Sequence, residues 1–240
     1  MKPQESEDAK VSLIRELFKG VAASYDTLLS LLTLGQARYW RRATVAAAHL
    51  KAGDTVLDVA TGTGLLAFVL SEAVGRNGLV VGVDVTPRMI HVGKVQNVTR
   101  GARIEFVSGR AENLPFREEV FDACTMSLAL RNVSDIERTI GEMRRVVRNR
   151  GVVVSLDFIR PPNRLFRKVY YLYLVRFMPL LGRLISPAWG RTFNYLALSI
   201  LGSRPVPQVL ETMRRVGLRP TRAELMTAGV VTLVQGWRRS

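Results

Sequence analysis

The spacing of apolar residues predicts helices at the start of the chain, followed by strands that alternate with helices. Residues 9–48 read as helical, because Val11, Ile14, Leu17 and Phe18 recur at helical spacing and residues 37–50 contain only good or neutral helix formers, with a short connector between the two stretches. From residue 55 onward apolar side chains form short runs next to glycines, as in strands buried on both faces. These runs predict strands at 55–60, 79–84, 103–108, 120–127 and 151–158, with helices at 64–75, 86–99 and 134–148.

Strands that alternate with helices in this way form a parallel sheet covered on both faces. After residue 162 the alternation stops, and the aromatic, apolar and arginine-containing stretch 164–201 predicts a helical cap. A helix at 206–216 and strands at 219–227 and 229–237 complete the chain. We predict one α/β domain of Rossmann-like type, with a mostly parallel seven-stranded sheet, N-terminal helices and a cap inserted after strand five. Its parts are the N-terminal helices 1–50, the cofactor-binding half 51–160, the cap 161–204 and the C-terminal helix and hairpin 205–240.

The start of the helix at 134–148 has a local signal of its own. Ser134 is followed three residues later by Glu137, which is the spacing of a capping box. We therefore predict that this helix begins at Ser134 and that the two side chains satisfy its first N–H groups.

Composition excludes several classes of protein. At 48% hydrophobic residues over 240 positions the chain can bury a large core. One cysteine, Cys124, and two histidines predict neither a disulfide framework nor a metal centre. The charged N-terminus has no signal-peptide pattern, and no window of about 20 residues lacks charge, so we expect a cytoplasmic protein without a transmembrane helix.

Positive charge is concentrated in the last third of the chain. The formal net charge is +15, and residues 158–240 hold 14 basic side chains against two acidic ones, Glu211 and Glu224. Such a surface suits either nucleic acid or an anionic membrane. Charge alone leaves both partners open.

A glycine-rich turn after the first predicted strand indicates a nucleotide-type cofactor. The turn contains Gly62, Thr63 and Gly64, and glycines let the backbone approach a ligand closely. The same pattern occurs in dinucleotide-binding proteins, where a pyrophosphate lies on the helix N-terminus. Asp58 at the end of the strand would repel a pyrophosphate but suits the cationic amino-acid end of S-adenosylmethionine. This carboxylate favours a methyltransferase over an oxidoreductase or a turn without a ligand.

Further cofactor-binding positions follow from the topology of such sheets, in which ligands bind beyond the carboxyl ends of the strands. Asp84 ends the second strand, where a carboxylate can accept both ribose hydroxyls. Residues Arg110, Ala111 and Glu112 follow the third strand and are expected to pass the adenine. Ser127 ends the fourth strand and is expected to line the methyl-transfer site.

The chain as a whole resembles the menaquinone/ubiquinone-biosynthesis C-methyltransferase family, a group of class I S-adenosylmethionine-dependent methyltransferases that includes demethylmenaquinone methyltransferase. The motifs that carry the resemblance are Val-Ala-Ala-Ser-Tyr-Asp (21–26), Leu-Asp-Val-Ala-Thr-Gly-Thr-Gly (57–64), Ala-Glu-Asn-Leu-Pro-Phe (111–116), Leu-Arg-Asn-Val-Ser-Asp (130–135), Phe-Asn-Tyr-Leu (193–196) and Met-Thr-Ala-Gly-Val-Val (226–231). The resemblance places Thr63, Asp84, Arg110, Ala111 and Ser127 at cofactor-contacting positions. It implies ring methylation of a membrane-dissolved prenylated quinol.

Ring methylation requires an electron-rich carbon, which loss of a proton from a neighbouring hydroxyl provides, and it requires stabilisation of the resulting oxyanion. Arg131 and Asn132, just after the fourth strand, are the residues we expect to orient the quinol oxygen. Tyr25, Asp157 and Tyr195 are further candidates for the proton transfer, with water as an alternative carrier.

The sequence offers different evidence for the two candidate partners of the basic surface, a membrane and a nucleic acid. Residues 164–185 combine basic, aromatic and aliphatic side chains, which suits peripheral docking on the inner face of an anionic membrane, although a cap packed on the sheet with a solvated basic edge fits equally. The segment after strand four, Ser127–Leu130, lacks the Pro-Pro-aromatic motif of nucleic-acid amino-methylases, so no nucleic-acid partner is expected. A methyltransferase acting on another lipid, such as a phospholipid, stays open. So does the oligomeric state, with a homodimer as one option.

Overall fold

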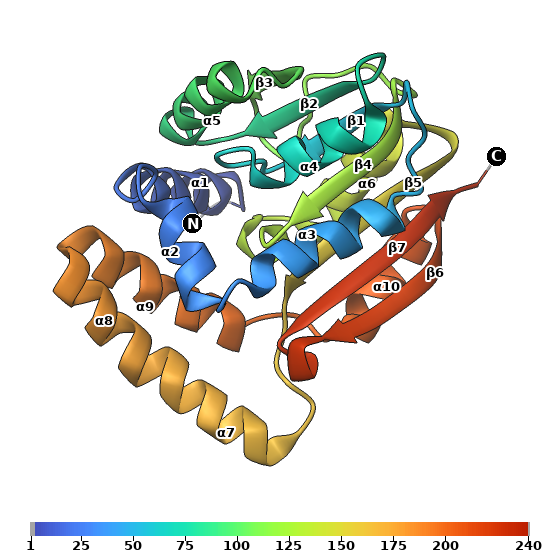
Figure 1. Cartoon of the computed structure of the whole chain (residues 1–240). Coiled ribbons are helices and arrows are strands. Elements are labelled where there is room, and N and C mark those ends of the chain that lie inside the picture. The colour runs from blue at the N-terminus through green and yellow to red at the C-terminus, as the bar shows by residue number, and fades with distance from the viewer. Residues whose placement is uncertain (1–2, 240) are drawn as a thin grey trace.

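The computed structural model describes residues 3–239, and a seven-stranded sheet forms its centre (Figure 1). The strand order is β3-β2-β1-β4-β5-β7-β6, in which β1 to β5 run parallel and β7 runs antiparallel to β5 and β6. The strands are β1 (Thr55–Val59), β2 (Leu79–Asp84), β3 (Ile104–Ser108), β4 (Phe121–Ser127), β5 (Val147–Phe158), β6 (Leu218–Met226) and β7 (Val231–Arg238). The prediction of a mostly parallel, Rossmann-like sheet is confirmed.

Helices cover both faces of this sheet because successive strand residues point to opposite sides. In β1, Val56 packs into the core on one face and Leu57 into the core on the other. The first face is covered by α3 (Gln36–Ala47), α4 (Leu65–Val74) and α5 (Pro87–Arg100), and the second by α6 (Ile136–Val146) and α10 (Val206–Arg215) (Figure 1). Continuous apolar runs in the strands therefore reflect burial on both faces.

The N-terminal helices and the cap lie beyond one end of the sheet. Helix α1 (Pro3–Lys19) and helix α2 (Tyr25–Leu32) precede α3, and the cap consists of α7 (Arg164–Leu172), a π-helical turn η2 (Tyr173–Phe177), α8 (Met178–Ile185) and α9 (Pro187–Leu201). Segments α7, η2 and α8 follow one another without a break in helical backbone and extend away from the sheet (Figure 1). Among residues 3–239, no helix has the length and apolar composition needed to cross a bilayer.

The capping-box prediction for α6 is wrong. The N-cap is Asp135, whose side chain accepts the N–H of Arg138, and the helix starts at Ile136. Ser134 does not cap because its N–H and its hydroxyl both donate to the carboxylate of Glu112, at 2.8 and 2.5 Å. Glu112, a buried residue 22 positions earlier in the chain, therefore binds the side chain that the spacing predicted as the cap. The spacing of Ser134 and Glu137 gives no sign of this partner.

Two of the central parallel strands end in strained residues. Ala60 follows β1 with φ of 54° and Leu128 follows β4 with φ of 58°, a left-handed conformation that side chains with a Cβ rarely adopt. Both turns lie at the carboxyl edge of the sheet, where the chain leaves β1 toward one side and β4 toward the other. Such a switch point is where open α/β sheets bind ligands.

Candidate active site

A cavity of about 150 Å³ lies at this switch point, between the carboxyl ends of β1, β2 and β4 and the helix α1. Ten of the residues predicted from the sequence line it. They are Tyr25, Asp58, Gly62, Thr63, Asp84, Arg110, Ala111, Glu112, Ser127 and Asn132. Val11, Ile14 and Phe18 of α1 close the side away from the sheet. We call this space the first cavity.

Asp58 is the most deeply buried acid of the first cavity, with 2% of its surface exposed. Its two oxygens accept the hydroxyls of Thr61 at 2.7 Å and Thr125 at 2.8 Å. Burial nevertheless raises the pKa of Asp58 to about 7, and the charge of nearby Asp84 adds to this effect. A carboxylate held in this way lacks a counter-ion, so the site favours a cationic ligand.

Asp84 and the glycine turn form the adjoining wall. The carboxylate accepts the N–H of Gly62 at 2.8 Å and that of Thr86 at 2.7 Å, and burial raises its pKa despite these bonds. Gly62 has a φ of 59°, and a Cβ built there would meet no atom within 4 Å, so the turn leaves open space beside the acid. Gly64, by contrast, is required for packing, because its Cβ would lie 2.8 Å from the ring of Phe106.

Asp26 is a site residue that the sequence did not identify. Its carboxylate accepts the hydroxyl of Thr63 at 2.5 Å and the side-chain amide of Gln96 at 2.7 Å. Thr63, which was predicted to contact the cofactor, lines the first cavity, and its hydroxyl connects the glycine turn to α2. These contacts hold α2, and with it Tyr25, against the glycine turn and α5. The motif Ser-Tyr-Asp at 24–26 was the signal available for this residue.

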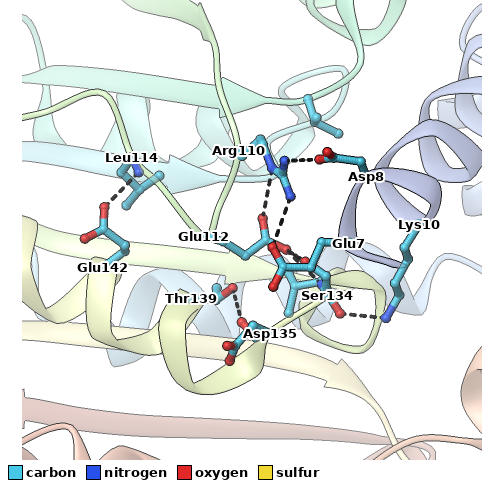
Figure 2. Close-up of polar contacts among 12 residues, drawn as sticks. Glu7, Asp8, Lys10, Arg110, Glu112, Leu114, Ser134, Asp135, Thr139 and Glu142 are labelled. Carbon is cyan, nitrogen blue, oxygen red and sulfur yellow. Dashed lines mark hydrogen bonds and ion pairs between the residues drawn. The ribbon is translucent and has the colours of Figure 1, made fainter. Parts of the chain in front are cut away.

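The segment after β3 fastens α1 to the sheet (Figure 2). The guanidinium of Arg110 pairs with Asp8 at 2.7 Å and Glu7 at 3.7 Å in α1, and lies 3.9 Å from Glu112. Lys10 of α1 donates to the carbonyl of Val133 at 2.6 Å. The side chain of Arg110 thus points to α1, and Arg110, Ala111 and Glu112 all contribute to the wall of the first cavity.

Glu112, which was expected to pass the adenine, lines the first cavity and also accepts hydrogen bonds from Ser134. It is 5% exposed, and both hydrogen bonds from Ser134 end on one of its oxygens. Burial alone would raise the pKa of Glu112, but these hydrogen bonds outweigh it and lower the pKa below its ordinary value. Glu112 therefore joins the loop after β3 to the loop before α6 and reaches the first cavity as part of its wall.

A second cavity of about 280 Å³ adjoins the first and is almost entirely apolar. It is enclosed by the N-terminal helices, by α7 and α9 of the cap, and by the turn before β7. The two cavities share five lining residues: Phe18, Tyr25, Leu29, Trp40 and Leu128. A ligand in each would therefore meet at this common wall, next to the strained Leu128.

Arg131 is the buried cation of the second cavity. Its side chain is 6% exposed and forms an ion pair with Asp157, whose carboxylate also accepts the backbone N–H of Arg131 at 2.7 Å. Nη1 donates to the carbonyl of Leu128 at 2.6 Å, and Nε donates to the Ser199 hydroxyl at 3.2 Å. The guanidinium carbon lies 5.1 Å from the centre of the Phe158 ring. These contacts fix the position of the guanidinium.

The other predicted catalytic residues differ in their placement. Asp157 lines neither of the two large cavities and lies behind Arg131, where the N–H of Phe158 donates to it as well. Tyr195 lines the second cavity and its hydroxyl donates to Oδ1 of Asn132 at 3.3 Å. Burial raises the pKa of Tyr195, and it raises the pKa of Tyr25 to about 12. Both phenols are therefore protonated near neutral pH.

The segment Met226–Val230 completes the second cavity. Thr227 has a φ of 51°, unusual for a β-branched residue, and its hydroxyl accepts the indole N–H of Trp40 at 2.8 Å. The Trp40 ring packs edge-on against Phe158 with 5.6 Å between centroids. The sequence singled out this segment, yet its role in placing Trp40 and Phe158 became visible only in the structure.

Similar proteins were found for almost the whole chain. The model of the ubiE/COQ5 methyltransferase family matches residues 4–238. The ubiquinone/menaquinone biosynthesis C-methyltransferase UbiE of Pseudomonas fluorescens (strain SBW25) is 38% identical over 233 residues, which cover 96% of this chain and 90% of that protein. The protein of the same name from Francisella tularensis subsp. novicida (strain U112) is 35% identical over 238 residues, with 98% and 94% covered.

Among solved structures, the chain is similar to a SAM dependent methyltransferase from Aquifex aeolicus, with a TM-score of 0.61, 18% identity, and 82% of this chain and 88% of that chain covered. It is also similar to Haemonchus contortus phosphoethanolamine N-methyltransferase 2 in complex with S-adenosyl-L-methionine. That match has a TM-score of 0.62, 13% identity, and 84% and 53% covered. At such identities the likeness shows the fold.

Proposed function

This chain belongs to the ubiE/COQ5 methyltransferase family, and from that membership and the two adjoining cavities we propose that it methylates a ring carbon of a prenylated quinol with S-adenosylmethionine. The observation that carries the proposal is the contrast between the cavities. The first is lined by three buried acids, Asp58, Asp84 and Glu112, and the second is apolar with a single buried arginine side chain. A polar cationic cofactor and an apolar ring with an ionisable oxygen fit these two environments respectively.

The first cavity suits the cofactor by its donors and acceptors. Asp58 would pair with the cationic amino-acid end, and Asp84 would accept hydroxyl groups of the ribose. The backbone of Gly62, the segment around Ala111 and the end of β4 at Ser127 complete the wall. When bound, S-adenosylmethionine supplies the methyl group as part of a sulfonium cation. The protein holds cofactor and ring in fixed relative positions, so that methyl transfer proceeds as an intramolecular step within the complex.

Arg131 is the residue we assign to the quinol oxygen. Since Nε and Nη1 are taken by protein acceptors, we infer that Nη2 faces the substrate and stabilises the oxyanion formed when the hydroxyl loses its proton. Asp157 keeps the guanidinium in place and is a positioning residue in this scheme. Asn132, held by the Tyr195 hydroxyl, lines the first cavity next to the common wall and helps to orient the ring.

Water is the proton acceptor that these environments favour. Asp157 is occupied by the ion pair and by two backbone N–H groups, and Tyr25 and Tyr195 hold their own protons near neutral pH. The positive charge of Arg131 lowers the pKa of the quinol hydroxyl, so water is basic enough to accept its proton. In this scheme the site needs no strong side-chain base.

We also infer that the protein docks on the inner, anionic surface of a membrane, where its substrate is dissolved. The cap helices α7 and α8 expose aliphatic side chains, among them Leu172, Leu180 and Leu184, between arginines. Residues 158–205 contain eight basic side chains and no acidic one. An apolar helical surface flanked by positive charge suits interfacial binding to anionic lipid.

The direct test is methyl transfer in vesicles that contain a demethylated prenylated quinol and labelled S-adenosylmethionine, followed by mass spectrometry of the quinone. We expect one methyl group on the ring. Arg131→Ala should lower kcat by about 100-fold or more while the cofactor Kd changes little. Equal losses of both, or labelled phospholipid or RNA in place of quinone, would contradict the proposal.

A further inference from the structure

Two segments that line the second cavity also carry exposed side chains, so they form part of its rim: the turn that joins α2 to α3, where Leu34 is 89% exposed, and the helix α7, where Phe166 is 37% exposed. From the turn, Thr33 and Leu34 reach the cavity, and from α7, Phe166 and Tyr170. These two segments are separated by about 130 positions in the sequence, and the fold places them on the same cavity.

The α2–α3 turn is ordered and presents aliphatic side chains to the outside. Leu34 is 89% exposed and has a φ of 49°, so a leucine is held in a strained conformation with its side chain in water. The turn is closed by the N–H of Gly35, which donates to the carbonyl of Ser30 at 2.8 Å, and by the hydroxyl of Thr33, which donates to Leu29 at 2.7 Å. Leu31, one turn earlier, is also exposed. Packing within the described protein does not account for this arrangement.

Helix α7 also exposes aliphatic side chains on its outer surface. Leu165, Val169 and Leu172 are spaced four and three residues apart, so they lie along one face of the helix, and each is more than half exposed. The inward side of the same helix provides Phe166 and Tyr170 to the cavity. Apolar surface therefore continues from the outside of both segments into the second cavity.

The charge around both segments indicates what covers them. Residues 27–53 contain four basic side chains and no acidic one, and residues 158–205 contain eight and none. Exposed aliphatic groups surrounded by positive charge complement the acyl chains and anionic headgroups of a lipid surface.

We propose that the α2–α3 turn enters the bilayer together with α7, so that the second cavity opens directly into the lipid. The prenyl tail then passes sideways from the acyl-chain region into the apolar cavity, without crossing water. This inference rests on the proposed function for the identity of the substrate. The lipid contact of the turn can be measured independently of any reaction.

The protein offers a convenient labelling test, because its one cysteine, Cys124, is fully buried. Leu34→Cys and Val169→Cys would be labelled with an environment-sensitive fluorophore and mixed with vesicles of phosphatidylglycerol and phosphatidylcholine. Val98→Cys in α5, at a position 83% exposed, is the matched control. We expect blue-shifted emission and quenching by spin-labelled acyl chains at 34 and 169 but not at 98. If the label at 34 behaves like that at 98, only the cap docks and the proposal is overturned.

A functional arm uses residues that line neither cavity. Leu31→Glu should raise the KM for a long-chain prenylated quinol in these vesicles by about tenfold or more, because a carboxylate is costly in the interface. The same variant should methylate a short-chain, water-soluble quinol at the wild-type rate, and Val98→Glu should behave as wild type with both. Loss of activity toward the short-chain quinol would point to damage of the site and overturn the inference. Failure of the wild-type protein with either quinol would instead refute the proposed function.

Discussion

Replacing Asp58 by asparagine is the most direct test of the proposal that the first cavity binds a cationic cofactor. The substitution keeps size and shape but removes the charge that burial disfavours. A pKa that rises from 3.8 to about 7 means that ionised Asp58 costs the folded protein about 4 kcal/mol relative to the unfolded chain above pH 7. This penalty is absent below about pH 4 and grows as pH rises from 4 to 7, where the unfolded carboxyl has lost its proton and the folded one has not. Above about pH 7 it stays constant.

The asparagine variant escapes that penalty at pH 8 but loses part of its hydrogen bonding. Its amide oxygen can accept only one of the two threonine hydroxyls fully, and the other, from Thr61 or Thr125, is left with a weaker partner at a cost of about 1–3 kcal/mol. The net expectation is a free protein more stable by about 2 kcal/mol, or roughly 4–8 °C in Tm at this chain length. Affinity for S-adenosylmethionine should fall by about tenfold or more, since the ammonium group loses its counter-ion.

Two measurements between pH 5 and 8.5 decide the matter. Differential scanning calorimetry of the free protein should show the wild type losing stability between pH 5 and 7, and the variant losing less over the same interval. Titration calorimetry should show wild-type cofactor affinity rising through pH 7, with a shallower rise in the variant. Glu105→Gln, at an exposed carboxylate of β3, is the control and should change neither quantity. A variant that is less stable than wild type at pH 8 and binds cofactor equally well would refute the reasoning.

Three further substitutions test the surrounding contacts. Asp157→Asn should lower the free energy of unfolding by about 3–5 kcal/mol, because Arg131 is left as an uncompensated buried cation; an unchanged Tm would contradict the buried pair. Asp26→Ala should raise the KM for S-adenosylmethionine more than that for the quinol, since α2 loses its contact with the glycine turn, and equal effects in steady-state kinetics would contradict this role. Arg110→Gln should speed cofactor dissociation several-fold at low salt, because it removes the ion pairs that hold α1 over the cavity. The difference should be smaller at 1 M salt, since these ion pairs are partly exposed and salt screens them. Stopped-flow traces with the same salt dependence in both proteins would contradict this role.

Much of the first cavity could be predicted because its residues follow directly from local patterns. Apolar runs buried on both faces located the strands, and in a parallel sheet their carboxyl ends fall on one edge, so Asp58, Asp84 and Ser127 had to converge. Strand ends were correct to within a few residues for the same reason. The largest discrepancy at a strand boundary is at β5, which begins at Val147, whereas a helix was predicted to 148 and the strand from 151. A second discrepancy, at Ser134, arose because the buried acid Glu112 from a distant loop accepts the hydrogen bonds of this residue.

The second cavity could not be predicted in the same way. It is assembled from the N-terminal helices, the cap and the turn at Thr227, which are far apart in the sequence. Their periodicity showed that they are helical and amphipathic, but not which apolar faces meet. Residue types alone suggested Asp157 as a candidate for proton transfer, and they gave no sign of its ion pair with Arg131.

The sequence by itself therefore determined the fold class, the cofactor-binding edge and the family, because helical and strand periods and short motifs act over a few residues. Only the tertiary structure decided how the cavities adjoin, which charge pairs with which, and where apolar surface stays uncovered. Those features depend on contacts between residues that are distant in the chain, and their energies depend on burial. Local sequence does not specify burial, and for that reason the pKa of Asp58 and the exposure of Leu34 emerged only from the folded protein.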